Sequence, residues 1–148
     1  MATFFDLDAA NETVPELRTI LETLRDERAQ LIALRDEFAR RAALETTPGD
    51  AAARTVEEAT ARTRQDAAER RRLRLRMQGV IDQMQAGVAR IDELGVTLRE
   101  IETGLVDFPA LVNGRQVWLC WRLGEGDVEW WHELSDGFGG RRPLIELA

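Results

Sequence analysis

Several residue types are scarce or missing in this chain of 148 residues. It has no lysine, so all 20 basic residues are arginine, and it has one cysteine and one histidine. The single cysteine, Cys120, excludes an intramolecular disulfide and suits a reducing compartment. With so few cysteines and histidines, the sequence has no recognisable zinc signature, and we predict no cofactor from it.

Long hydrophobic runs are missing as well. No apolar stretch approaches the roughly 20 residues that cross a membrane. Segment 1–11 carries acids where a secretory signal carries bases, so we expect a soluble, cytoplasmic protein with no membrane segment. The net charge of -7 argues against nonspecific affinity for nucleic acid or anionic membranes, because phosphate-rich surfaces repel an acidic protein.

The first half of the chain has the pattern of a helix. Apolar residues recur at three- and four-residue steps over Val14–Leu44, which indicates an amphipathic helix. Thr13 is placed to cap this main helix, and Asp6 or Asp8 to cap a short leading turn. Segment Thr46–Gly49 contains proline and glycine, so we expect the helix to end there and the chain to reverse.

A second helix is predicted from Asp50, which caps it, to Leu94, with Gly95 in a left-handed conformation at its end. Its apolar positions keep a four-three rhythm that is typical of a coiled coil. They are Leu73, Met77, Val80, Met84, Gly87, Ile91 and Leu94. Before Leu73 the same rhythm falls on small and polar residues, which predicts weak packing there. Residues 1–94 are therefore predicted to form a long antiparallel helical hairpin.

One local concentration of positive charge lies on the second helix. Segment Arg62–Arg76 holds seven arginines against Asp66 and Glu69. The segment is either a contact surface for RNA, DNA or an acidic protein, or a solvated helix face paired with acids of the first helix. We favour the solvated face, because the arginines spread around much of the helix. We therefore do not expect nucleic-acid binding.

After Gly95 the pattern changes from helical to alternating, which predicts a small antiparallel β module over 95–148. Asn113-Gly114 is a strong hairpin signal between two of its strands. Extended segments are predicted around 96–101, 106–108, 116–123 and 128–134. The predicted fold class is therefore α+β, with a long, coiled-coil-like helical hairpin followed by a small antiparallel sheet.

The register of the last two strands follows if the turn at Gly124–Asp127 closes symmetrically. Leu123 then faces Val128, and Leu119 faces His132. This register collects an apolar face consisting of Val117, Leu119, Trp121, Leu123, Val128, Trp130 and Leu134. We expect that face to be the core of the module, packed on the base of the hairpin.

His132, the only histidine, falls on this apolar face. As a functional residue it is a candidate acid, base or metal ligand, with Glu133 and Asp107 as candidate catalytic partners. As a structural residue it would bond backbone groups or a carboxylate, which is the commoner arrangement. The sequence therefore assigns neither a catalytic residue nor a metal site, and His132 is only a weak metal candidate.

The opposite face is predicted to gather Trp118, Cys120 and Trp131, with Arg122 at its rim. These indoles are either covered by the rest of the protein or form an aromatic anchor for a partner. Cys120 reads as a small core hydrophobe without an activating basic neighbour. The candidate partner- or ligand-binding residues are Trp118, Trp131, Arg122, Glu125 and Arg141.

The glycine-rich tail Ser135–Pro143 is predicted to be a loop. Its backbone amides, with Arg141 or Arg142, have the chemistry to wrap an anion. Such tails are more often connectors, and this one lacks the spacing of a phosphate-binding loop.

Short motifs in the chain carry a resemblance to a known family. The specific ones are Gly104–Pro109, Cys120–Glu125, Trp131–Leu134 and Gly137–Arg141, and the others are Ala10-Asn11, Pro15–Leu17 and Glu93–Val96. Together they resemble the bacterial family catalogued as domain of unknown function 2203, over nearly the whole chain. The resemblance implies a bacterial, soluble protein and no particular reaction, cofactor or substrate. Its motif residues that coincide with the candidates above are Asp107, Trp121, Arg122, Glu125, His132, Glu133 and Arg141.

Two functions compete on this evidence. The leading hypothesis is a non-enzymatic interaction module, in which the hairpin forms a homodimer and the β module contacts a protein partner. Each helix of a lone hairpin can bury only one apolar seam, which favours a dimer with a four-helix arrangement. The alternative is an enzyme, or a small-ligand or metal-binding protein, with its site around His132. Its polar lining would be Asp107, Glu125, Glu133 and Arg141.

Overall fold

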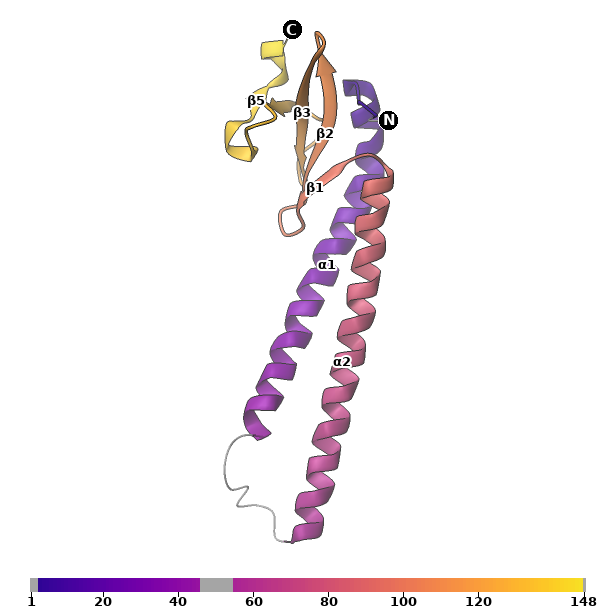
Figure 1. Ribbon diagram of the computed structural model, residues 1–148, viewed down its shortest axis with the longest axis vertical. Coiled ribbons are helices and arrows are strands. Elements are labelled where there is room, and N and C mark those ends of the chain that lie inside the picture. The colour runs from indigo at the N-terminus through magenta and orange to yellow at the C-terminus, as the bar shows by residue number, and fades with distance from the viewer. Residues whose placement is uncertain (1–2, 46–54, 148) are drawn as a thin grey trace. The chain divides into compact units, whose positions relative to one another are not determined.

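The computed structural model describes residues 3–45 and 55–147. Two α-helices, α1 (Leu7–Glu45) and α2 (Val56–Glu93), precede an antiparallel sheet (Figure 1). This arrangement confirms the predicted α+β fold class. The predicted reversal at Thr46–Gly49 and the predicted cap Asp50 lie outside the described residues.

The chain divides into two compact units. One unit contains the sheet with residues 7–28 of α1 and 84–93 of α2, and the other contains residues 29–83. No helix within the described ranges is both long and apolar enough to cross a membrane. The domain boundary between 94 and 95 that the sequence pattern suggests stays a prediction.

Helix α1 is continuous from Leu7, so the prediction of a separate leading turn and of a cap at Thr13 is wrong. Asp6 caps the helix, because its Oδ1 accepts a hydrogen bond from Ala9 N at 2.7 Å. The Thr13 hydroxyl instead donates to Ala9 O at 2.8 Å. Pro15 lies inside the helix and removes one backbone hydrogen bond. An apolar row runs past it without a break and is buried, which offsets that loss; it comprises Ala10, Val14, Leu17, Leu21 and Leu24.

Helix α2 follows the predicted rhythm. Thr55 caps it by accepting a hydrogen bond from Glu58 N at 3.0 Å, and Gly95 follows its end with φ +80°. The seam positions Leu73, Val80 and Ile91 are buried, as the pattern predicts.

Packing in the unit 29–83 is thin, as expected. The seam position Val56 is 84% exposed, although Leu34, Leu73 and Val80 of the same unit are buried. In the arginine-rich segment, Arg72 pairs with Glu69 of its own helix. Nothing in the structure tests nucleic-acid binding, so its absence stays a prediction.

The sheet has five antiparallel strands in chain order: β1 (Thr97–Glu100), β2 (Leu105–Val112), β3 (Arg115–Arg122), β4 (Trp130–His132) and β5 (Arg142–Pro143). Asn113 and Gly114 join β2 to β3 with φ of 52° and 77°, which confirms the predicted tight hairpin. Strand β5 was not predicted, because the tail was read as a loop. Two short 3-10 helices, η1 (Phe138–Gly140) and η2 (Leu144–Leu147), flank it.

The predicted register of β4 is wrong by one residue. Trp118, and not Leu119, lies opposite His132, while Leu119 lies opposite Trp131 and Cys120 opposite Trp130. Because side chains alternate along a strand, this shift moves His132 off the core face and puts Trp131 on it.

The observed register differs from the predicted one because of the loop between β3 and β4. Hydrogen bonds hold this loop in a conformation other than a symmetric turn. Gly126 O accepts a hydrogen bond from Trp121 Nε1 at 2.8 Å. Val128 N donates to Asn11 Oδ1, in the first turns of α1, at 2.7 Å. The loop therefore continues through Glu129, and strand β4 begins only at Trp130.

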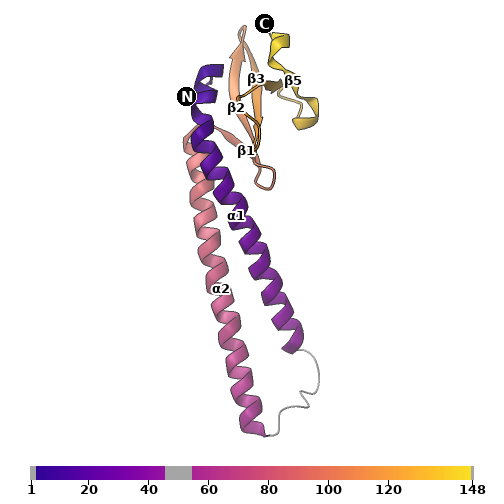
Figure 2. The same cartoon turned by 180° about the vertical axis from the view of Figure 1, so that it is seen from behind.

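One face of the sheet packs on α1 and the end of α2. Phe5 contacts Phe108 edge to face, with ring centroids 5.1 Å apart. The first turns of α1 lie beside β2 in both views of the chain (Figures 1 and 2). Trp121 is fully buried in this core, as predicted. The sheet residues that are buried in this hydrophobic core are Val106, Phe108, Ala110, Val117, Leu119, Trp121 and Trp131. The other face is consequently free to carry polar groups.

Candidate functional site

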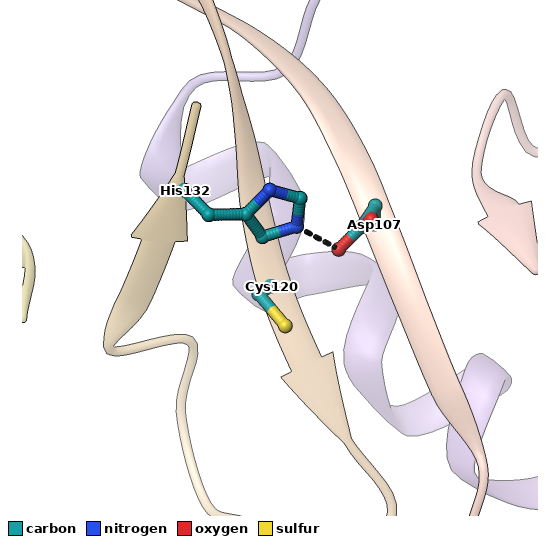
Figure 3. A group of neighbouring side chains, drawn as sticks. All are labelled: Asp107, Cys120 and His132. Carbon is teal, nitrogen blue, oxygen red and sulfur yellow. Dashed lines mark hydrogen bonds and ion pairs between the residues drawn. The ribbon is translucent and has the colours of Figure 1, made fainter. Parts of the chain in front are cut away.

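Three adjacent strands each contribute one side chain to a cluster on that second face. Asp107 of β2 lies opposite Cys120 of β3, and His132 of β4 is close to both (Figure 3). The three residues are 2%, 1% and 1% exposed, respectively. One oxygen, the sulfur and one ring nitrogen all lie within 4.8 Å of one another. The sheet therefore builds a compact buried cluster from three separate sequence motifs.

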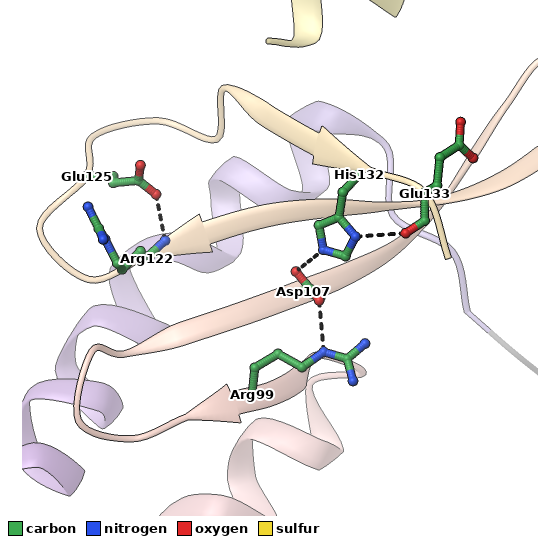
Figure 4. A network of polar contacts seen from close by, with 6 residues as sticks. All are labelled: Arg99, Asp107, Arg122, Glu125, His132 and Glu133. Carbon is green, nitrogen blue, oxygen red and sulfur yellow. Dashed lines mark hydrogen bonds and ion pairs between the residues drawn. The ribbon is translucent and has the colours of Figure 1, made fainter. Parts of the chain in front are cut away.

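Both ring nitrogens of His132 have a partner (Figure 4). Nδ1 lies 2.8 Å from the backbone oxygen of Glu133. Nε2 lies 3.0 Å from Asp107 Oδ1. A carbonyl oxygen only accepts, so Nδ1 carries a proton and donates it. A neutral ring then presents the lone pair of Nε2 to a carboxylate oxygen, and two acceptors in contact need a positive centre between them.

Arg99 supports the cluster from β1. Its Nε donates to the second oxygen of Asp107 at 2.8 Å, and its guanidinium lies 4.9 Å from the ring of Trp118. The carboxylate is thereby oriented, with Oδ1 turned to His132 and Oδ2 to Arg99 (Figure 4). Arg99 was absent from the sequence-based candidates, because nothing in a single arginine of an exposed strand marks it.

The Cys120 thiol is not activated as a nucleophile. Its burial and the negative charge of Asp107 raise its pKa to about 12, and the positive charge of Arg141 opposes them. The free thiol is therefore protonated near neutral pH. Together with the burial of His132, this argues against a cysteine-histidine nucleophile open to solvent.

The cluster has the composition of a transition-metal site. Imidazole nitrogen, thiolate sulfur and carboxylate oxygen all bind zinc, at bond lengths of about 2.0–2.3 Å. Tetrahedral geometry then places ligand atoms about 3.3–3.7 Å apart. In the structure, His132 Nε2 and Asp107 Oδ1 are 3.0 Å apart, and the three ligand atoms all lie within 4.8 Å of one another. The spacing expected in a zinc site falls between these two distances. A cation between these atoms needs only small side-chain movements.

A second group of predicted residues meets beside the cluster. Glu125 Oε1 accepts a hydrogen bond from Arg122 N at 2.7 Å, and Oε2 pairs with Arg141 Nη2. The Arg141 guanidinium lies 4.5 Å from the ring of Trp130 and 4.6 Å from that of Phe138. The structure thus brings Arg122, Glu125 and Arg141 together.

The remaining candidates have other surroundings. The Glu133 carboxylate pairs with Arg115 at 2.8 Å, so only the backbone oxygen of Glu133 belongs to the cluster. Trp131 is in the core, 3% exposed, and is not part of an exposed aromatic anchor. Trp118 is half-buried beneath Arg99, and Trp130 occupies the place on this face that was predicted for Trp131.

Cys120 was not predicted as a partner of His132. The predicted register had placed the two residues on opposite faces of the sheet. A signal was present, because the motifs Gly104–Pro109, Cys120–Glu125 and Trp131–Leu134 each carry one possible ligand.

The fold and this cluster define a protein with a helical hairpin and a five-stranded sheet that holds a buried Asp-Cys-His group. The chain belongs to the family described as Uncharacterized conserved protein (DUF2203), whose family model matches residues 3–144. This finding confirms the family resemblance drawn from the motifs. Neither a curated protein nor a solved structure matches the chain.

Proposed function

We propose that the protein binds a divalent transition metal, best matched by zinc, through Asp107 Oδ1, Cys120 Sγ and His132 Nε2. The observation that carries the proposal is the contact between Nε2 and Oδ1 at 3.0 Å, with Nδ1 already committed to a carbonyl. A metal ion satisfies both acceptors at once and recruits the sulfur beside them.

Charge balance supports a dication at this position. A thiolate and a carboxylate carry two negative charges, which a divalent ion neutralises in a site where water solvates little. Burial disfavours the thiolate of the free protein, and metal coordination is the ordinary way in which a buried thiol loses its proton. Arg99 on the outer oxygen of Asp107 has the position of a residue that orients a ligand.

The ligand set also favours one metal class. Mixed sulfur, nitrogen and oxygen ligands suit zinc, whereas calcium and magnesium prefer oxygen alone. Three protein ligands leave a fourth tetrahedral position open, as in sites that bind a further molecule, while structural zinc sites have four protein ligands. We therefore favour a ligand-binding role for the metal over a purely structural one.

The competing explanation is a proton between Asp107 and His132, which makes the cluster a structural ion pair. Zinc titration of metal-free protein against a competing chelator separates the two. We expect about one zinc ion per chain, because one set of ligands is present. The variants Asp107→Asn and His132→Gln should lose it, and Glu133→Gln, whose carboxylate points to Arg115, should keep it. Zinc uptake that is equal in all four proteins would contradict the proposal.

Self-association of the helical hairpin is a second candidate, supported by one specific observation. Leu75 is 69% exposed. It lies two residues after the buried Leu73, on the side of α2 away from the seam. A large apolar side chain there is available to a second copy of the chain. We propose a homodimer through this surface, and a protein partner as the alternative occupant.

A further inference from the structure

Arg141 is a buried cation with incomplete hydrogen bonding. Its side chain is 9% exposed, and Nη2 pairs with Glu125. Its Nη1 is buried and has no hydrogen-bond partner within the part of the chain that the structure describes. Buried polar groups in proteins are nearly always satisfied, so an unpaired guanidinium nitrogen calls for an explanation.

The guanidinium is held in place rather than free to turn toward solvent. The rings of Trp130 and Phe138 pack against it at 4.5 and 4.6 Å, and Glu125 fixes one of its nitrogens. Its donors lie in the guanidinium plane, in a rigid fork. The unpaired Nη1 is therefore preorganised to donate to a group that the described residues do not supply.

This donor belongs to an arginine that packs on the same face of the sheet as the proposed metal ligands. Trp130 lies opposite Cys120 in the sheet, and both side chains are on the face that carries His132. Arg141 stacks on Trp130. This face of the sheet thus carries the Asp107, Cys120 and His132 cluster together with the residue on which the unpaired donor stacks.

A second arginine lies at the outer side of the same group. Arg122 is two residues after Cys120 on β3, so it projects from the same face. It is exposed, and its guanidinium lies 4.9 Å from the ring of Phe138. Among the described residues its side chain has no carboxylate partner, in contrast to Arg115, which pairs with Glu133. Two arginines therefore flank the ring of Phe138.

We propose that Arg141 Nη1 binds the oxyanion of a small carboxylate or phosphate compound whose other oxygen takes the open position on the metal. This inference rests on the metal site proposed above and names the ligand class of that site. A guanidinium nitrogen and a metal ion on the same side of a buried cluster favour an anion over a neutral or cationic molecule. Arg122 assists by attracting the anion.

Cobalt-substituted protein provides the test, because the visible spectrum of Co²⁺ reports its ligands. Inorganic phosphate and acetate are added separately to the cobalt protein. We expect a saturable spectral change with at least one of them. If phosphate alone changes the spectrum, the ligand class is phosphate, and if acetate alone does, it is carboxylate.

Substitutions of Arg141 connect the spectral change to the residue. Arg141→Gln should weaken the binding of the anion by about tenfold or more, the effect of one charge-assisted hydrogen bond. Arg141→Lys keeps the charge without the fork and should have an intermediate effect. Arg142→Gln is the matched control, since that arginine stacks on Trp131 of the opposite face, and it should bind as the unaltered protein does.

The outcomes separate the two proposals. If no cobalt spectrum with a sulfur ligand forms, the metal site itself fails. If the spectrum forms but neither anion changes it, or Arg141→Gln responds as the unaltered protein does, the anion site is refuted while the metal site stands. Circular dichroism and the anion-free cobalt spectrum show whether each variant has folded. If Arg141→Gln has not folded, the anion binding of Arg141→Lys tests the anion site instead.

Discussion

The imidazole Nε2 of His132 lies 3.0 Å from Oδ1 of Asp107, and neither atom has a proton of its own to give while the ring is neutral and the carboxylate is charged. The role of the cluster therefore depends on whether a metal ion or a proton lies between these two atoms. Cys120 beside the pair supports a metal ion, because its sulfur offers a third ligand that a proton shared by two atoms does not need.

Replacement of the sulfur tests this directly. Cys120→Ala should retain the fold, because the side chain is small and its loss creates little cavity. It should also weaken zinc binding by about a hundredfold or more, as the loss of an inner ligand exceeds that of an outer one. Competition with a chromogenic chelator measures the change. Zinc affinity that is equal to that of the unaltered protein would show that Cys120 is no ligand.

Arg99 should act on the metal through Asp107. Arg99→Gln removes the hydrogen bond to the outer carboxylate oxygen, and we expect zinc binding to fall by about 10–100-fold. Arg90→Gln is the control, since Arg90 pairs with Glu16 and Glu93 of the helices. An equal effect of both substitutions in the same competition assay would assign the loss to general destabilisation.

The register of β4 makes a prediction about stability. Trp131 is 3% exposed in the core, so Trp131→Ala should cost about 3–5 kcal/mol of unfolding free energy. Trp130 is half-buried on the other face, and Trp130→Ala should cost less, about 1–2 kcal/mol. Urea denaturation compares the two. The reverse order would support the symmetric turn that the sequence suggested.

Self-association is tested at Leu75. If the exposed side of α2 forms a homodimer, Leu75→Glu should convert it to a monomer, because a carboxylate is costly in an apolar interface. Gln65→Glu introduces the same charge at an exposed site on the flank of α2 and should leave the dimer intact. Light scattering gives the molecular mass. A monomer in the unaltered protein at high micromolar concentration would end the proposal.

Local signals predicted much of this fold. The helical rhythm of α2, the left-handed Gly95 and the Asn113-Gly114 turn each depend on residues close in sequence, and the structure confirms them. The cap at Thr13 was a local signal too. This prediction failed because the buried apolar row of α1 continues past Pro15. The burial of these side chains stabilises the helix by more than one missing hydrogen bond costs.

The errors in the candidate site arose from contacts between distant residues. The bond from Val128 N to Asn11 joins residues 117 apart and helps to set the start of β4, which no turn motif reveals. His132 and Asp107 were identified as candidates from their chemistry alone. Cys120 lies on the same face as His132 only in the observed pairing of β3 with β4. The role of Cys120 could therefore not be predicted before this pairing was known.

X-ray absorption at the zinc edge tests the central claim most directly, because it reports which atoms surround the metal. For protein loaded with one equivalent of zinc, the account predicts one sulfur at about 2.3 Å, with nitrogen and oxygen at about 2.0 Å. The sulfur shell should disappear in Cys120→Ser. Zinc that is not retained, or that is surrounded only by nitrogen and oxygen, would contradict the account.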